Sequence, residues 1–349
     1  MLGLVCVLLF CSPQGFDKPV EIGEIELFGQ TGVDGAAIRR GITVREGDKI
    51  TADKFGEVKA NIESAVQKVV GKPATDVALV GFDEKGKLMI FVGVPGPTVK
   101  MPPTSKPPHG PQRLAEEGMR LYDRFGSRLV PALQSGGGKE DDSKGYALFS
   151  DPELHAIQLD MRDFAVKHTK EVFDVLTYSG SVADRRAASE IAGYAERSKE
   201  QVDALMNALG DEDGTVRNNA IRSLGVILRT DKKTAASLST EPFIDLVRSG
   251  TWTDRNKGAM VLDELTESRS KPLLDKVRKE ALASLLEMAH WRNFPHARTA
   301  LTILGRVAGI DEARLQKMHD SGDAAPIFKA LGASTPSGRR ACLPRLGRA

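Results

Sequence analysis

The six histidines of this chain are the first residues to test for chemistry, because imidazole is a common metal ligand and general base. The two closest in sequence are His290 and His296, with Asn293, Phe294 and Pro295 between them. A proline interrupts a helix, so the two rings cannot act as paired ligands on one helical face. A zinc site also needs about four ligands, and no cysteine cluster supplies the others. We therefore expect no metal site.

A second place for chemistry is the run Gly136-Gly137-Gly138-Lys139, which has the glycines and lysine of a phosphate-binding loop. Glu140 stands where such a loop needs Ser or Thr, and no strand is predicted before it. Serine-nucleophile, zinc-protease and dinucleotide-binding motifs are also missing from the sequence. The sequence therefore predicts no catalytic residues and no cofactor.

The second half of the chain contains a repeat, which predicts how its helices are arranged. Three residues recur at one constant interval: Arg185, Ala188 and Gly193 return as Arg217, Ala220 and Gly225. Such a period is typical of stacked helix pairs, because each pair buries its apolar face only against the next pair. In the clearest unit, apolar residues at helical spacing lie on either side of a turn at 211–214.

This unit resembles a HEAT repeat of the short bilin-lyase type. The matching residues are Leu209, Asp211, Val216, Arg217, Ala220, Leu224 and Gly225. Later units keep part of the frame: Arg255, then Ala300, Leu304 and Gly305. The resemblance implies an all-α HEAT-like solenoid over residues 112–332. It also implies that the recurring arginines brace neighbouring turns through acids such as Asp184, Asp213 and Asp254, rather than forming a ligand-binding row.

Residues 19–95 follow a different order of elements. The pattern predicts a strand ending at Gly29, a short helix near Ile38, a turn at 44–50, and a helix at 51–71 capped by Thr51 or Asp53. A hairpin follows, with its turn at 83–86. This β-α-α-β-β order resembles a POTRA domain, the polypeptide-transport-associated module of outer-membrane assembly and secretion systems. The fold class is thus an α+β N-terminal domain plus an all-α HEAT-like solenoid.

The N-terminal run MLGLVCVLLF is too short to span a bilayer and fits the hydrophobic part of a secretory signal. We predict a signal peptide at 1–15 and export to the periplasm or cell envelope; the alternative is a buried strand. Cys11 sits where a lipoprotein carries its lipid, but Phe10 is not the small residue that such signals require. Removing the signal leaves Cys342 as the only cysteine, which excludes an intramolecular disulfide.

Two further segments complete the predicted organisation. Residues 96–111 are rich in proline and predict a semi-rigid spacer between two domains. Residues 333–349 hold four arginines and no acid, and predict a disordered basic tail. Because the net charge of the whole chain is only +2, the sequence predicts no nucleic-acid surface. It predicts no transmembrane span after the signal either.

We expect this protein to be a non-enzymatic scaffold of the cell envelope that binds protein partners. A solenoid supplies a large rigid surface, on which the resemblance places Asp203 and Asn207 at the concave side. The N-terminal sheet offers an edge strand for an extended partner, with Val77, Leu79 and Phe82 as candidate contacts. The alternative is a bilin-lyase-like enzyme or chaperone acting on an acceptor protein. Trp252 and Trp291 are expected to anchor a core or interface.

Overall fold

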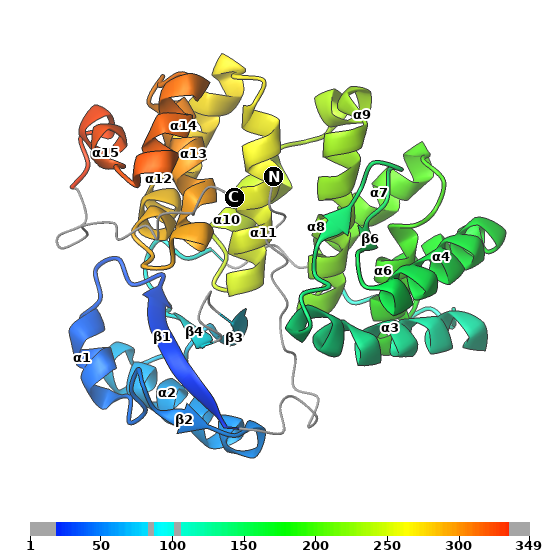
Figure 1. Ribbon diagram of the computed structural model, residues 1–349, viewed down its shortest axis with the longest axis horizontal. Coiled ribbons are helices and arrows are strands. Elements are labelled where there is room, and N and C mark those ends of the chain that lie inside the picture. The colour runs from blue at the N-terminus through cyan, green and yellow to red at the C-terminus, as the bar shows by residue number, and fades with distance from the viewer. Residues whose placement is uncertain (1–18, 83–86, 101–105, 335–349) are drawn as a thin grey trace.

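A computed structural model describes residues 19–82, 87–100 and 106–334 of the chain (Figure 1). A small N-terminal sheet unit is followed by a body that is almost entirely helical. The predicted leader at 1–15 with Cys11, the turn at 83–86 and the arginines of the basic tail with Cys342 lie outside the described residues, as does the side chain of Phe82.

The sheet unit contains four strands in the order β2-β1-β4-β3. They are β1 (Val20–Phe28), β2 (Lys49–Ile50), β3 (Asp76–Phe82) and β4 (Leu88–Gly93). β1 and β4 are parallel, whereas β2 pairs antiparallel with β1 and β3 pairs antiparallel with β4. The segment expected to be only a turn at 44–50 thus adds the short strand β2 to the sheet.

Two helices, α1 (Gly35–Gly41) and α2 (Phe55–Val70), pack on one face of the sheet. Asp34 caps α1 by accepting a hydrogen bond from the amide of Ala37 (2.9 Å). The expected cap of the second helix is wrong: a 3₁₀ turn η1 (Ala52–Lys54) precedes α2, and Lys54 stands at its N-cap with no side-chain bond. The buried face of α2 carries Val58, Ile62 and Val66, at the helical spacing seen in the sequence.

The helical body begins with α3 and a small hairpin and continues through twelve more helices of the described chain. Their bounds are α3 (Glu116–Gln134), β5 (Glu140–Asp141), β6 (Leu148–Phe149), α4 (Pro152–Lys167), α5 (Thr169–Tyr178), α6 (Val182–Ala192), α7 (Lys199–Ala208), α8 (Gly214–Thr230), α9 (Lys232–Ser237), α10 (Glu241–Val247), α11 (Trp252–Thr266), α12 (Lys271–Ala289), α13 (Phe294–Val307), α14 (Glu312–Ser321) and α15 (Ala325–Leu331). The sequence predicts one long helix that starts at Asp151-Pro152 and runs through Phe164 and Phe173. The structure has two helices there, α4 and α5, which meet at His168.

Helices of the body pack in pairs, namely α5 with α6, α7 with α8, α10 with α11, and α12 with α13. The second helices of these pairs also pack on one another in succession, and we call α6, α8, α11 and α13 the inner row. The first helices, α5, α7, α10 and α12, form the outer row. A stack of this kind buries each pair only against its neighbours.

The second face of the sheet packs on the helical body, so the two units share an interface (Figure 1). The proline-rich segment 96–111, for which the sequence predicts a spacer, bonds to the helical body at its described ends. At its first end the amide of Lys100 donates to the carbonyl of Arg248 (2.9 Å), and at its second end Gly110 donates to Tyr178 (2.8 Å). Both acceptors lie at the ends of outer-row helices, α10 and α5, so the described ends of the segment contact the helical body.

Candidate functional site

Aromatic rings fill the interface between the sheet and the helical body. Phe91 of β4 lies 5.1 Å from both Trp252 and Trp291, measured between ring centroids, and 5.7 Å from His296. Phe28 at the end of β1 meets Trp291 edge-on at 6.5 Å. All five side chains are buried. The two tryptophans therefore anchor an interface, as expected, and aromatic pairs of this geometry stabilise it beyond the area that they bury.

Glu287 on α12 links the two units by hydrogen bonds. Its carboxylate accepts the main-chain amides of Gly29 and Gln30 at 2.8 and 2.9 Å, just beyond β1. The same carboxylate pairs with Arg255 of α11 at 2.7 Å. A single acid, whose side chain is 10% exposed, thus satisfies two amides of the sheet unit and one guanidinium of the helical body.

Recurring arginines connect successive helix pairs, at closest distances between 2.7 and 2.9 Å. Arg185 pairs with Asp211, Arg217 with Asp254, and Arg255 with Glu287. Each guanidinium also donates to a main-chain carbonyl six residues earlier, at Ser179, Asp211 and Ser249. We call these three arginines and their acids the arginine ladder. It spans the inner row from α6 to α11 and ends at Glu287.

The arginines therefore do brace neighbouring turns. Among the three expected acids, however, only Asp254 forms an ion pair with one of these arginines. Asp184 instead accepts the amide of Leu114 at 2.8 Å. Asp213 caps α8 and pairs with Arg186 at 2.6 Å. For Asp213 the difference follows from the helix start, where a short acid bonds the nearby amides of Thr215 and Val216. Asp184 bonds an amide 70 residues earlier in the chain.

Small residues of the repeat frame are buried, and two of its glycines permit close contacts. Ala188, Ala220, Ala300, Leu224 and Leu304 are fully buried. A Cβ at Gly193 would lie 2.3 Å from the Ser223 hydroxyl oxygen, and a Cβ at Gly305 would lie 2.1 Å from a Leu315 methyl carbon. The sequence also predicts that the small Gly225 allows close helix approach, but a Cβ there would have its nearest atoms 3.6 and 3.9 Å away, so the packing does not require a glycine.

The two edges of the sheet differ. Next to the short β2, the edge of β1 is occupied by side chains: Ile25 donates its amide to Glu46 (3.1 Å), and its carbonyl accepts from Arg39 (2.6 Å) and Arg292 (3.0 Å). Such charged side chains block pairing with another strand. At the opposite edge, β3 pairs only with β4 in the part of the chain that the structure describes.

Two of the three candidate contacts on β3 point into the protein. Val77 and Leu79 are each 7% exposed and belong to the core between the sheet and α2. Ala78 and Val80 belong to the core on the opposite side. Residues 77–80 are thus buried on both faces of the sheet, and their main chain pairs with β4 on one side.

Asp203 and Asn207 are exposed on α7, which belongs to the outer row. Both lie away from α8, the second helix of the pair, and their expected place on a concave binding surface stays a prediction. Asp203 pairs with Lys199 at 2.5 Å, one turn earlier on the same helix. An exposed pair of this type contributes little to stability.

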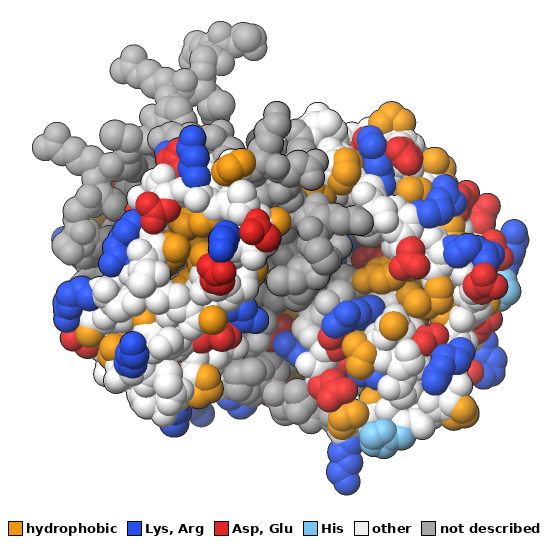
Figure 2. Space-filling view, turned by 90° about the horizontal axis from the view of Figure 1, so that it is seen from below, with side chains coloured by type: hydrophobic (Ala, Val, Ile, Leu, Met, Phe, Trp, Pro, Cys, Tyr) orange, Lys and Arg blue, Asp and Glu red, His pale blue; other side chains and the backbone are white. Residues whose placement is uncertain are grey.

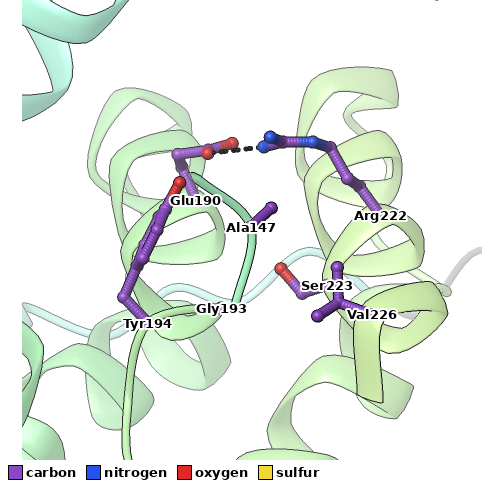
Figure 3. A pocket seen from close by; sticks show the side chains of 7 residues that line it. All are labelled: Ala147, Glu190, Gly193, Tyr194, Arg222, Ser223 and Val226. Atoms are coloured by element: carbon purple, nitrogen blue, oxygen red, sulfur yellow. Dashed lines mark hydrogen bonds and ion pairs between the residues drawn. The ribbon is translucent and has the colours of Figure 1, made fainter. Parts of the chain in front are cut away.

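A buried polar cluster lies between α6 and α8 (Figure 3). Glu190 and Arg222 point toward each other and join at 2.9 Å, and Arg222 also bonds Glu140 of β5. The hydroxyl of Tyr194 accepts a hydrogen bond from Gln158 at 2.8 Å. The cavity that these side chains border holds about 10 Å³, which is room for about one water and not for a substrate.

Burial and charge shift the pKa values of this cluster in opposite directions. Burial raises the pKa of Glu190, and the Arg222 guanidinium only partly offsets this effect. Burial would raise the pKa of Glu140 as well, but the charges of Arg222, Lys257 and Arg229 outweigh it and bring that pKa below its ordinary value. Glu140 is therefore held as a carboxylate by cations on α8 and α11.

The sequence analysis did not single out Glu140 as one end of a long-range ion pair. Arg222 lies 82 residues away, and no local pattern links the two positions. The one visible signal is the acidic run that follows the glycines, at residues 140–142. Its partners become known only once the hairpin is placed on α8.

A surface hollow of about 410 Å³ between α3 and α4 is lined mainly by charged side chains of both signs. One pair across it, Arg124 and Asp160, is 3.3 Å apart with both side chains more than half exposed. Figure 2 shows acidic and basic side chains interspersed over both units on the face seen there. The described side chains of that face form no single-sign patch of the kind that binds nucleic acid.

Within residues 19–82, 87–100 and 106–334, no group of three or more His, Cys, Asp or Glu side chains is arranged to hold a metal ion. His290 ends α12 and His296 lies buried in α13, on either side of the break that Pro295 predicts. None of the described helices combines the length and the apolar character needed to cross a membrane.

No protein-family model matches this sequence, and no curated protein matches it at a significant level. The POTRA-like and HEAT-like resemblances therefore stay predictions that rest on residue patterns. The structure itself defines a protein of mixed class, in which a small sheet unit is joined to a helical body.

Proposed function

We propose that this protein is a non-enzymatic, protein-binding scaffold of the cell envelope, and that an extended segment of a partner pairs with the edge of β3. The observation that carries this proposal is the contrast between the two sheet edges. Side chains fill the β1 edge, whereas β3 pairs only with β4 among the described residues. Main-chain bonds at such an edge give affinity for an extended segment without needing side-chain pockets.

The helical body supports this role by holding the sheet unit rigidly. The amide of Trp252 donates to Asp76 at the start of β3 (2.8 Å), and Thr75 donates to the carbonyl of Gly250 (2.7 Å). One end of the edge strand is thus fixed to the turn before α11. A fixed edge loses less conformational entropy when a partner binds.

Proline substitutions at the consecutive positions Ala78 and Leu79 test the proposal. One of these two amides bonds to β4 and the other points away from β4. Proline at the outward amide should leave the protein folded and abolish capture of the partner recovered with the wild type. Leu79→Ala controls for the lost leucine side chain. Undiminished capture by both proline variants, in folded protein, would contradict the proposal.

Export is the second part of the proposal and rests on the apolar run at the start of the sequence. A C-terminally tagged protein should be found beyond the cytoplasmic membrane and should lack about the first 15 residues. A cytoplasmic protein that begins with Met1 would contradict it.

A further inference from the structure

The hairpin between α3 and α4 places a polar segment on the inner row. Residues 139–145, which we call the strap, contain no apolar side chain. The strap nevertheless lies against α8, where Glu140 bonds Arg222 and Asp142 accepts from Arg229 at 2.7 Å. Its end is held by Arg197, which donates to the carbonyl of Gly145 at 2.9 Å.

The contacts of the strap differ from those of the chain that follows it. Leu148 and Phe149 are 3% and 2% exposed and belong to the main core, so the base of the hairpin is fixed by apolar packing. The strap is held by charged and polar bonds and by a ladder of only two residue pairs. A two-stranded ladder this short has little stability of its own.

Glycines bound the strap at both ends. Gly136 and Gly145 have φ values of +84° and +87°, the left-handed region that favours glycine. A Cβ at Gly136 would meet no atom within 4 Å, so its main-chain conformation, and not packing, is the reason for glycine there. Glycine thus sets the main-chain conformation before the strap and at its last residue.

The surface beneath the strap is basic, and its positive charges stabilise the ionised form of a carboxylate. Three cations, Arg222, Lys257 and Arg229, lower the pKa of Glu140 although its partial burial acts to raise it. Arg222 lies at the centre, between Glu140 of the strap and Glu190 of α6. The strap therefore occupies this surface as an acidic, extended ligand would.

We propose that the surface of α8 beneath the strap is a binding site for an extended acidic segment of a partner protein, and that the strap is its resident, displaceable occupant. The site is separate from the edge of β3, so the failure of either proposal leaves the other testable. Because the strap is tethered, its effective concentration is on the order of millimolar, and a partner competes against that value.

A labelled synthetic peptide with the sequence of residues 136–147 is the probe. Full-length wild-type protein should bind it weakly, and the variant Glu140→Gln/Asp142→Asn should bind it about tenfold more tightly or better, because its own strap has lost both charges. Adding Arg229→Ala to that variant should remove the gain. A peptide carrying Asp141→Asn should bind as well as the original, because Asp141 is exposed and contacts neither arginine.

Equal binding by wild type and the strap variant, with melting temperatures that agree, would overturn the proposal. The proposal would also be overturned if the strap variant kept its tighter peptide binding after Arg229→Ala. Displacement of the peptide by inorganic phosphate, at matched charge and ionic strength, would overturn it as well. If the strap variant does not fold, a dye at Ser143→Cys, with Cys6, Cys11 and Cys342 changed to Ser, reports on the otherwise unaltered strap. Excess peptide should then increase the dye's rotational mobility, and an unchanged signal would also overturn the proposal.

Discussion

Arg217 of α8 grips Asp254 of α11 through two hydrogen bonds, of 3.0 Å from Nε and 2.9 Å from Nη2, and both side chains are buried. Ser249 adds a hydroxyl donor to the same carboxylate at 2.8 Å. This ion pair is the middle one of the three in the arginine ladder. It joins the helix pairs α7–α8 and α10–α11, which do not follow the constant interval of the repeat.

Arg217→Leu should lower the free energy of unfolding by about 3 to 5 kcal/mol, because it leaves the buried Asp254 carboxylate without its cation. The double variant Arg217→Leu/Asp254→Leu should recover much of that loss. Lys199→Ala, which breaks the exposed pair with Asp203, should cost less than about 1 kcal/mol. Chemical denaturation followed by circular dichroism measures all three. A loss at Arg217 no larger than that at Lys199 would show that the ladder does not stabilise the stack.

Glu287 offers a test of how firmly the sheet unit is joined to the helical body. Glu287→Gln should destabilise the protein by about 2 to 4 kcal/mol, because the new amide group cannot accept from both main-chain donors and Arg255. Asp275→Asn on the same helix breaks only an exposed pair with Lys271 and should have little effect. Tryptophan fluorescence during denaturation reports the loss of the interface directly, since Trp252 and Trp291 lie in it. Equal denaturation midpoints for Glu287→Gln and Asp275→Asn would show that Glu287 does not hold the sheet unit to the helical body.

Two glycines of the same repeat frame should respond to alanine in opposite ways. Gly225→Ala should stabilise the protein by up to about 1 kcal/mol, because alanine is the better helix former and its Cβ makes only ordinary contacts. Gly305→Ala should destabilise it by about 1 to 3 kcal/mol, because Leu315 must move. Melting temperatures decide between these signs. Stabilisation at both positions would mean that α13 and α14 do not approach as closely as described.

Acid should weaken the interface through His296, which is 4% exposed. Burial lowers its pKa from 6.5 to about 4, and the charge of Lys257 adds to that effect. Above pH 6.5 the imidazole is neutral whether the chain is folded or not, so its contribution is fully present. Between pH 6.5 and about 4 the unfolded chain binds a proton that the folded chain does not, which costs about 3 kcal/mol.

Asp76 acts in the opposite direction, because burial raises its pKa to about 6 and folding then favours its protonated form as the pH falls. The test is therefore a comparison of slopes, measured by denaturation between pH 7.5 and 4. His296→Leu should lose less stability on acidification than the wild type. Parallel profiles for the two proteins would show that His296 does not titrate with this shifted pKa.

The residue patterns predicted most elements but fewer of their contacts. The period of apolar residues located α2, α7 and α8, and Asp151-Pro152 located the start of α4. Patterns of this kind report which face of an element is buried and where it starts. They missed β2, whose two residues depend on pairing with β1, and the break at His168, because helical periodicity continues across it.

Contacts between distant segments could not be derived from the sequence. The proline-rich segment 96–111 predicted a spacer because proline lacks an amide donor, yet Lys100 and Gly110 donate theirs to the helical body. Val77 and Leu79 looked suited to a partner, but they pack against α2. Burial of both faces of a strand depends on elements that the strand's own sequence does not specify.

Hydrogen exchange at β3 is the measurement that tests the proposed function most directly. In the free protein, the amides of residues 77–80 that do not bond to β4 should exchange faster than those that do. With a partner recovered alongside the full chain, these faster amides should slow by about tenfold or more, while those of β1 change little. A bound partner that leaves every β3 amide at its free rate would contradict pairing at this edge.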